Sequence, residues 1–185
     1  MKNYFIQYKT FLLFLSKFLL VYLVLTFCYE FYLEQFNIKK FEVDSFTVSV
    51  AKQTKNTLLF FNQNVIIKQH PLEASIQLWY NNHYIARIIE GCNAITVMIL
   101  FLSFVVAFTG KFKNSFWFIL FGLIFIHLLN IGRIATLTVL LFYFPNQQTL
   151  LHDILFPILL YGAVFFLWIV WVNYYSIYAK QNFKK

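Results

Sequence analysis

The chain has 185 residues, of which 61% are hydrophobic, 22% aromatic and only 12% charged. A soluble domain carries roughly a quarter charged residues, so this composition excludes an ordinary soluble protein and indicates a membrane protein. The net charge of +8 fits membrane topology and contact with anionic lipid. It does not indicate nucleic-acid binding, because the sequence has no basic helix with interleaved residues that read bases.

Four apolar runs predict transmembrane helices, at residues 11–29, 95–109, 116–144 and 154–175. Most of them are long enough to cross a hydrocarbon core of ~30 Å as a helix. The second run reaches that length only if its helix begins near Cys92. The first run lacks a small-residue cleavage site and is long for a signal peptide, so we expect a retained helix.

The lysines set the expected orientation. Short lysine-rich segments mark the cytoplasmic side of a membrane, and four crossings would place both tails and the connection at 111–113 on that side. These segments carry Lys2, Lys9, Lys111, Lys113, Lys180, Lys184 and Lys185. All seven carboxylates fall on the opposite, outer side: Glu30, Glu34, Glu42, Asp44, Glu73, Glu90 and Asp153. We therefore expect a multi-pass protein with both termini in the cytoplasm.

The outer segment, about residues 30–90, is the one insert between the predicted membrane helices. Residues 30–46 mix aromatic and charged side chains and predict a helix on the membrane surface, and residues 65–68 predict a strand. Two β-rich runs flank Asn81-Asn82, which predicts a hairpin. This hairpin leads directly into Glu90-Gly91-Cys92 and holds that segment rigid. The expected fold is an all-α polytopic membrane protein, a single domain over 1–185 with a small extracytoplasmic helix and β-hairpin insert.

Three reactive side chains converge on the outer face in this topology. Cys92 opens the second helix from the outside, and His152 precedes the fourth helix on the same side. Arg133 lies ~26 Å along a helix that starts at Phe116 on the inner face, which is close to the outer interface. Ionisable groups at membrane depth usually mark function. The alternative for Arg133 is a snorkelling anchor, but apolar residues 134–144 continue past it.

The position of Cys92 favours a thiolate. A helix N-terminus carries partial positive charge, a nearby guanidinium adds to it, and Gly91 allows a substrate to approach the backbone. The alternative is a small buried apolar residue, which suits Cys28 inside the first helix. A disulfide between Cys28 and Cys92 is a further option. The four histidines are scattered and no CxxC motif occurs, so the sequence predicts neither a metal nor a cofactor site.

His152 has the intrinsic basicity for proton transfer near neutral pH, the alternative being an ordinary interfacial histidine. Asp153 does not face His152 on a regular helix and is expected to cap the fourth helix, with Pro157 in or near its first turn. Asn130 lies about one turn before Arg133 and is expected to orient the guanidinium. His127 is deeper in the same helix and is expected to form a hydrogen bond between helices.

Taken together, Glu90-Gly91-Cys92-Asn93, Asn130-Ile-Gly-Arg133 and Leu151-His152-Asp153 resemble the exosortase/archaeosortase family. The order of the cysteine, arginine and histidine, their spacing and their membrane position all match, over roughly residues 84–175. The short chain is most similar to the exosortase F type of Bacteroidetes. Many family members have additional helices ahead of this region, and their absence here suggests that a partner contributes to substrate binding.

The resemblance implies a membrane-embedded cysteine peptidase or transpeptidase of the cell inner membrane. Its partners would be an exported protein with a C-terminal sorting signal, membrane lipid and an accessory membrane protein. Cys92 would be the nucleophile, Arg133 the stabiliser of the oxyanion and the thiolate, and His152 the general acid and base. The implied supporting residues are Glu90, Gly91, Asn93, Asn130 and Asp153. Two alternatives from other classes are a non-catalytic scaffold of an envelope or secretion complex and a small transporter subunit, which would need polar residues through the whole bilayer.

Overall fold

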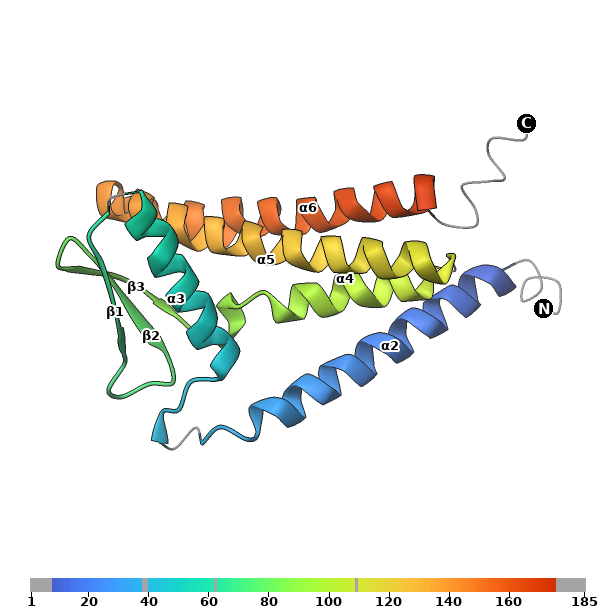
Figure 1. Cartoon of the computed structure of the whole chain (residues 1–185), viewed down its shortest axis with the longest axis horizontal. Coiled ribbons are helices and arrows are strands. Elements are labelled where there is room, and N and C mark those ends of the chain that lie inside the picture. The colour runs from blue at the N-terminus through green and yellow to red at the C-terminus, as the bar shows by residue number, and fades with distance from the viewer. Residues whose placement is uncertain (1–7, 38–39, 62, 109, 176–185) are drawn as a thin grey trace.

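Three apolar helices run along the long axis of the molecule, a fourth lies obliquely beside them, and a further helix with a sheet lies at one end (Figure 1). This computed structural model describes residues 8–37, 40–61, 63–108 and 110–175. The four apolar helices are α2 (Lys9–Leu33), α4 (Ile95–Ala107), α5 (Phe112–Tyr143) and α6 (Phe156–Val170). Among the lysines of the topology prediction, Lys2, Lys180, Lys184 and Lys185 lie outside the described residues.

Three stretches of the described chain are long and apolar enough to cross a membrane: Phe11–Leu33, Phe112–Tyr143 and Pro145–Tyr175. The predicted helical membrane fold is therefore confirmed in part, because α4 has only 13 residues and extends about 20 Å at ~1.5 Å per residue. The expectation that its helix begins near Cys92 is wrong. Residues Glu90–Cys92 form a separate 3₁₀ turn, η2. Ala94 then takes a left-handed conformation with φ of 65°, which breaks the α-helical path between the two elements.

The helix of the insert is α3 (Ser45–Phe60), and the predicted surface helix over 30–46 is wrong. Instead, α2 continues to Leu33, and a new helix starts where Asp44 accepts a hydrogen bond from the backbone N–H of Thr47 at 2.9 Å. Such a carboxylate at the N-cap satisfies a backbone donor that would otherwise lack a partner. Val50 and Leu58 on α3 are buried against the sheet, so this helix packs on protein.

The sheet is antiparallel with strand order β1-β2-β3. It comprises β1 (Val65–Gln69), β2 (Ile76–Tyr80) and β3 (His83–Ile88). The predicted hairpin is confirmed, since Tyr80 pairs with His83 and both turn residues have positive φ, 48° for Asn81 and 63° for Asn82. A two-residue turn of this hand matches the twist of paired strands. The predicted strand at 65–68 is also confirmed, and it adds a third strand to the hairpin.

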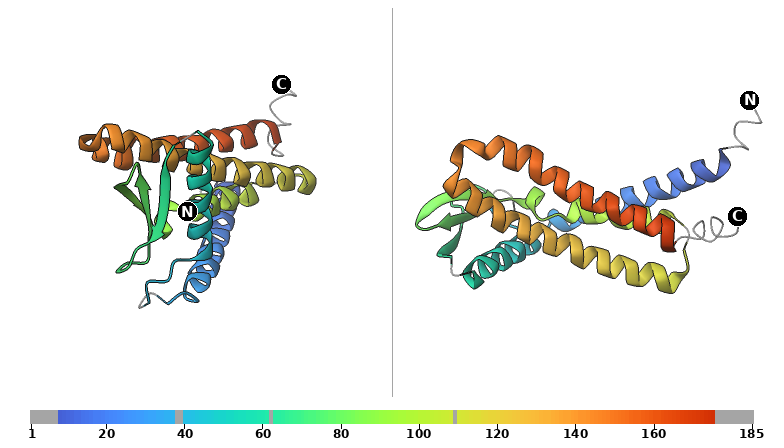
Figure 2. Two further views of the ribbon diagram at one scale, coloured as in Figure 1. Left: turned by 60° about the vertical axis from the view of Figure 1, so that its left-hand side comes forward. Right: turned by 90° about the horizontal axis from the view of Figure 1, so that it is seen from above.

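Two larger apolar cores follow one another along α5, and a small third cluster joins its last turns to η4 and the start of α6. Near its C-terminal end, Ile134 and Ala135 pack with α3 and the sheet. Nearer its N-terminal end, α5 packs with α4 and α6, around Phe101, Ile126 and Val164. Figure 2 shows the same division, with α3 and the sheet gathered where α5 passes into α6. The last turns of α5 thus belong to the insert, which explains why apolar residues continue past Arg133.

Helix α2 is the least integrated of the long helices. None of the most apolar part of its span is buried in the described structure. Its main side-chain contacts are aromatic, with the Phe14 ring centroid 5.7 Å from Phe104 and 4.4 Å from Phe108. A mainly apolar helix with no buried residue in its most apolar part is stable only against lipid or another protein, so the exposed side of α2 faces one of the two.

Candidate functional site at the junction of helices and sheet

Cys92, Arg133 and His152 line one cavity of about 570 Å³. Its volume falls in the usual range for ligand sites. Its lining comes from β3 together with Ile89, from η2, from α5, and from Gln148 and His152, the latter on η4, a π-helix at Thr149–Leu155. The convergence expected from the sequence is therefore present as a shared cavity. Among the described residues, no hydrogen bond or ion pair joins the three side chains directly.

Cys92 is half-buried and ends η2. Its backbone N–H donates to the carbonyl of Ile89 at 2.9 Å. The thiol does not stand at the N-terminus of α4, because that helix begins three residues later and its first N–H donates to Asn93 Oδ1 at 2.9 Å. The helix-dipole argument for activating this thiol is therefore wrong. Both described cysteines are free thiols, with Cys28 exposed on α2.

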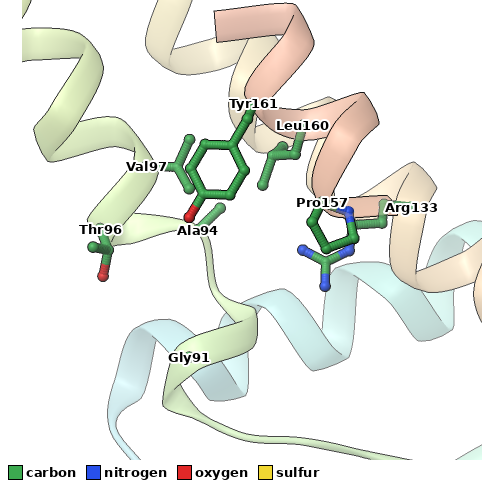
Figure 3. A pocket seen from close by; sticks show the side chains of 8 residues that line it. All are labelled: Gly91, Ala94, Thr96, Val97, Arg133, Pro157, Leu160 and Tyr161. Atoms are coloured by element: carbon green, nitrogen blue, oxygen red, sulfur yellow. The ribbon is translucent and has the colours of Figure 1, made fainter. Parts of the chain in front are cut away.

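Arg133 lies where the two cores of α5 meet. Its Nε is buried and has no hydrogen-bond partner among the described residues. The guanidinium also borders a second cavity of about 340 Å³ between the start of α4 and α6 (Figure 3). This second cavity is lined by Gly91, Ala94, Thr96, Val97, Arg133, Pro157, Leu160 and Tyr161. A snorkelling anchor would place its head in open water, whereas this head points into two cavities.

His152 has a carboxylate partner that sequence reasoning had excluded. Its Nδ1 lies 2.6 Å from Asp153 Oδ1, and the two side chains are 45% and 60% exposed. Neighbouring side chains diverge less on a π-helix than on an α-helix, since each turn contains more residues. Asp153 therefore pairs with His152 and does not cap α6, which begins at Phe156 with Pro157 in its first turn. Because an ionised carboxylate can only accept, Nδ1 is the donor in this pair, and Nε2 is the ring nitrogen left for other partners.

Two buried asparagines hold the backbone around the thiol. Asn130 on α5 donates from Nδ2 to the carbonyl of Cys92 at 2.8 Å, and among the described residues it makes no hydrogen bond to Arg133. Asn93 donates to the hydroxyl of Tyr29 at 2.9 Å and to Thr47 Oγ1 at 3.1 Å. These bonds connect the thiol's segment to α5, α2 and α3. The predicted role of Asn130 in orienting the guanidinium is corrected to a role at Cys92.

The remaining predicted residues lie on the rim of the site or beside it. Glu90 and Gly91 are exposed, and an added Cβ at Gly91 would meet no atom within 4 Å. A side chain at position 91 would therefore fit, and the fold does not require glycine there on steric grounds. His127 Nε2 lies 2.8 Å from Gln53 Oε1, which confirms the expected hydrogen bond between helices. In the described part of the chain no group of three metal-ligating side chains gathers.

Sequence reasoning missed several residues of the site. Tyr84, Arg87 and Gln148 line the larger cavity, and Tyr161 lines the smaller one. Tyr29 and Thr47, which bind Asn93, are 64 and 46 residues away from it. Of these, only the residues of β3 could have been placed near the site from the sequence, because the predicted hairpin leads directly to Cys92.

Fold and site together define a helical membrane protein with a thiol, a guanidinium and an imidazole around one cavity. No protein-family model, no curated protein and no solved structure matches the chain.

Proposed function

We propose that this chain is a membrane-embedded cysteine peptidase or transpeptidase of the exosortase type, acting on C-terminal sorting signals of exported proteins. The observation that carries the proposal is the single cavity shared by Cys92, Arg133 and His152. A nucleophile, a cation and a base are the side chains that acyl transfer needs. The η2 segment after β3, helix α5 and the π-helix η4 supply them from distant parts of the sequence.

In the proposed reaction His152 takes the proton of the Cys92 thiol, and the sulfur attacks the scissile carbonyl and forms a tetrahedral intermediate. Arg133 stabilises its negative oxygen, as cationic and N–H donors do in acyl transfer. The intermediate collapses to a thioester as the carbon–nitrogen bond breaks, and His152 gives a proton to the departing amine. Asp153, paired with His152 Nδ1, holds the ring so that Nε2 carries out this transfer. An acceptor nucleophile then gives its proton to His152 and attacks the thioester, and His152 passes that proton to the leaving sulfur, which restores the Cys92 thiol.

For orientation, we propose that the insert and the cavity face the periplasm and that both termini lie in the cytoplasm of an inner-membrane protein. Lys111 and Lys113 flank the start of α5, at the end of the molecule opposite the sheet (Figure 1). The start of α2 with Lys9 lies at the same end. Short basic segments are retained in the cytoplasm, so this clustering supports the proposed orientation.

The exposed apolar surface of α2 fits either lipid or the accessory membrane protein of this proposal. A substrate with a sorting signal carries its own membrane helix, and binding it requires protein surface in the bilayer. Small helical interfaces in membranes depend on packing and a few polar bonds. We assign the cavity to the reaction. We assign the exposed surface of α2 to contacts with lipid, with the accessory membrane protein or with the membrane helix of the substrate.

The test uses an exported reporter that carries a C-terminal sorting signal, co-expressed with the full chain. Cys92→Ala and Cys92→Ser should both abolish processing, because neither variant forms a thioester, while the protein remains inserted. Cys28→Ala is the matched control and should process the reporter at the wild-type rate, since Cys28 lies exposed on α2. Full processing by Cys92→Ala would rule out covalent catalysis and favour the non-catalytic scaffold.

A further inference from the structure

Strand β3 is an edge of the sheet. Its described backbone hydrogen bonds go to β2, and no other described backbone segment pairs with it. An edge strand presents a row of free N–H and C=O groups that can pair with another extended chain. The six consecutive residues from Tyr84 to Ile89 line the larger cavity. The free edge therefore faces the site and not open solvent alone.

The extended backbone of β3 leads directly to the thiol. Ile89 continues the strand with φ of −109° and ψ of 171°, and Cys92 follows three residues later. A peptide paired with the last part of β3 therefore has one end next to the sulfur. The register irregularity of the hairpin lies opposite Leu78 and Trp79, so residues 86–89 form the regular part of the edge.

The two cavities meet beside the thiol. Gly91 and Arg133 line both of them. The larger cavity has a strand as a wall, whereas the smaller one is lined by helical side chains such as Val97 and Leu160 (Figure 3). A carbonyl attacked at Cys92 would have its acyl side in one cavity and its amine side in the other. Only the larger cavity offers backbone groups to hold an extended acyl side.

We propose that the substrate binds as an extended peptide that adds a strand to the edge of β3. The residues before the scissile bond lie opposite residues 86–89 and run in the same direction as β3, toward Cys92. This inference rests on the proposed function and specifies how that site recognises its substrate. Main-chain pairing supplies the affinity, and alternate peptide side chains face the cavity walls for selectivity. The site thus selects an extended conformation before it selects a sequence.

The first experiment varies the peptide. Acetyl-tetraalanyl chloromethyl ketone reacts with the full chain in membranes, the Cys92 sulfur displacing chloride to form a thioether, and intact mass gives the rate. Four analogues each carry one N-methylated amide. Because every second amide of a paired strand points at its neighbour, alternate analogues should react about 3- to 10-fold more slowly, the effect of one hydrogen bond. Equal rates for all analogues, or a loss without alternation, would overturn the pairing.

The second experiment varies the chain. Proline is tolerated in an edge strand where the N–H faces away from the sheet. Of Ala86→Pro and Arg87→Pro, the variant that keeps the fold should react with the tetrapeptide reagent about 3- to 10-fold more slowly, normalised to its rate with iodoacetamide. Ile66→Pro and Ile67→Pro on β1, the other edge, are matched controls and should not change this ratio. An unchanged ratio in a folded β3 variant contradicts the proposal, and if neither folds the peptide series decides.

The two kinds of reagent test the strand pairing and the proposed function separately. Iodoacetamide carries no peptide, so slow labelling of Cys92, no faster than Cys28, would count against the enzyme itself. Fast iodoacetamide labelling without alternation among the peptides would remove only the strand pairing. A concentration-dependent dimer that is lost in the β3 proline variant would assign the edge to a second copy of the chain and overturn the substrate assignment.

Discussion

At the scale of the residue, Arg133 is the side chain whose surroundings most require a partner. Its Nε is buried, and no described group accepts a hydrogen bond from it. The side chain is half-buried, and a buried N–H donor without an acceptor is costly. Both cavities that it borders are also lined by Gly91, next to Cys92. A thiolate, or the oxyanion that forms on a bound substrate, meets this requirement.

The first prediction concerns thiol reactivity. A polar alkylating reagent added from outside at a pH near 7 should modify Cys92 faster than Cys28, because only Cys92 shares a cavity with a guanidinium. Arg133→Lys should slow the reaction of Cys92, since a lysine cannot reproduce the planar fork of arginine. Residue-resolved mass spectrometry measures both rates. Equal slow labelling of the two cysteines would contradict the activation.

The second prediction concerns the imidazole. His152→Ala should lower the processing rate by at least ~10²-fold, the usual scale for a lost general acid or base. Asp153→Asn should have a smaller effect in the same direction, because it keeps a hydrogen-bond acceptor but loses the negative charge that supports the imidazolium. The measurement is the initial rate of reporter cleavage at matched protein levels. An Asp153→Asn variant more impaired than His152→Ala would contradict the assigned order of roles.

At the scale of the element, the sequence predicted pieces with strong local signals and failed where tertiary contacts decide. The Asn81-Asn82 hairpin was predictable because its turn residues favour positive φ. The start of α4 was not, because the left-handed conformation of Ala94 has no signature in alanine. The helix α3 was hidden by an overall polar composition, and Asp44 identifies its start only in retrospect. The pairing of His152 with Asp153 depends on a π-helical turn, which propensity does not indicate.

The candidate site followed the same rule. Its three central residues could be predicted from motif order and topology, whereas its support could not. The predicted partner of Asn130 was wrong. Spacing along the helix indicated Arg133, whereas in the fold Asn130 donates to the carbonyl of Cys92. Contacts between residues many turns apart, such as Asn93 with Tyr29, leave no periodic pattern in a single sequence.

The third prediction tests the support of the thiol. Asn130→Ala should destabilise the chain by about 1–3 kcal/mol, because it leaves the part-buried carbonyl of Cys92 without its donor. It should also slow Cys92 labelling by the tetrapeptide reagent. His127→Ala on the same helix removes a hydrogen bond to Gln53 and is the control, with reduced stability but unchanged labelling. Thermal unfolding in detergent and intact mass give the two readouts. Equal labelling in both variants would limit Asn130 to a structural role.

At the scale of the whole molecule, α5 connects a membrane-type bundle to the insert. Its first turns pack with α4 and α6, and its last turns pack with α3 and the sheet. The cavity lies at the change between these two environments. In the proposed orientation, a peptide from the aqueous side and a membrane-anchored segment would meet there without either crossing the bilayer.

The fourth prediction concerns topology. Reporter fusions after Lys113 and after Lys185 should read cytoplasmic, and a fusion near Asn56 on α3 should read external, because the basic segments cluster at the end opposite the insert. The short length of α4 makes the Lys113 fusion the critical one. An external signal there would mean that α4 does not return the chain to the cytoplasmic face. That result would contradict the proposed orientation.

Covalent catalysis at Cys92 is tested most directly by measuring the mass of the chain during turnover. We predict that a sample quenched in acid after co-expression with the sorting-signal reporter contains a fraction of chain with an acyl group on Cys92. Neutral hydroxylamine should release this group, because it attacks thioesters, and the adduct should be absent from Cys92→Ala and present in Cys28→Ala. Processing that proceeds in Cys92→Ala, or an adduct that maps to another residue, would contradict the account.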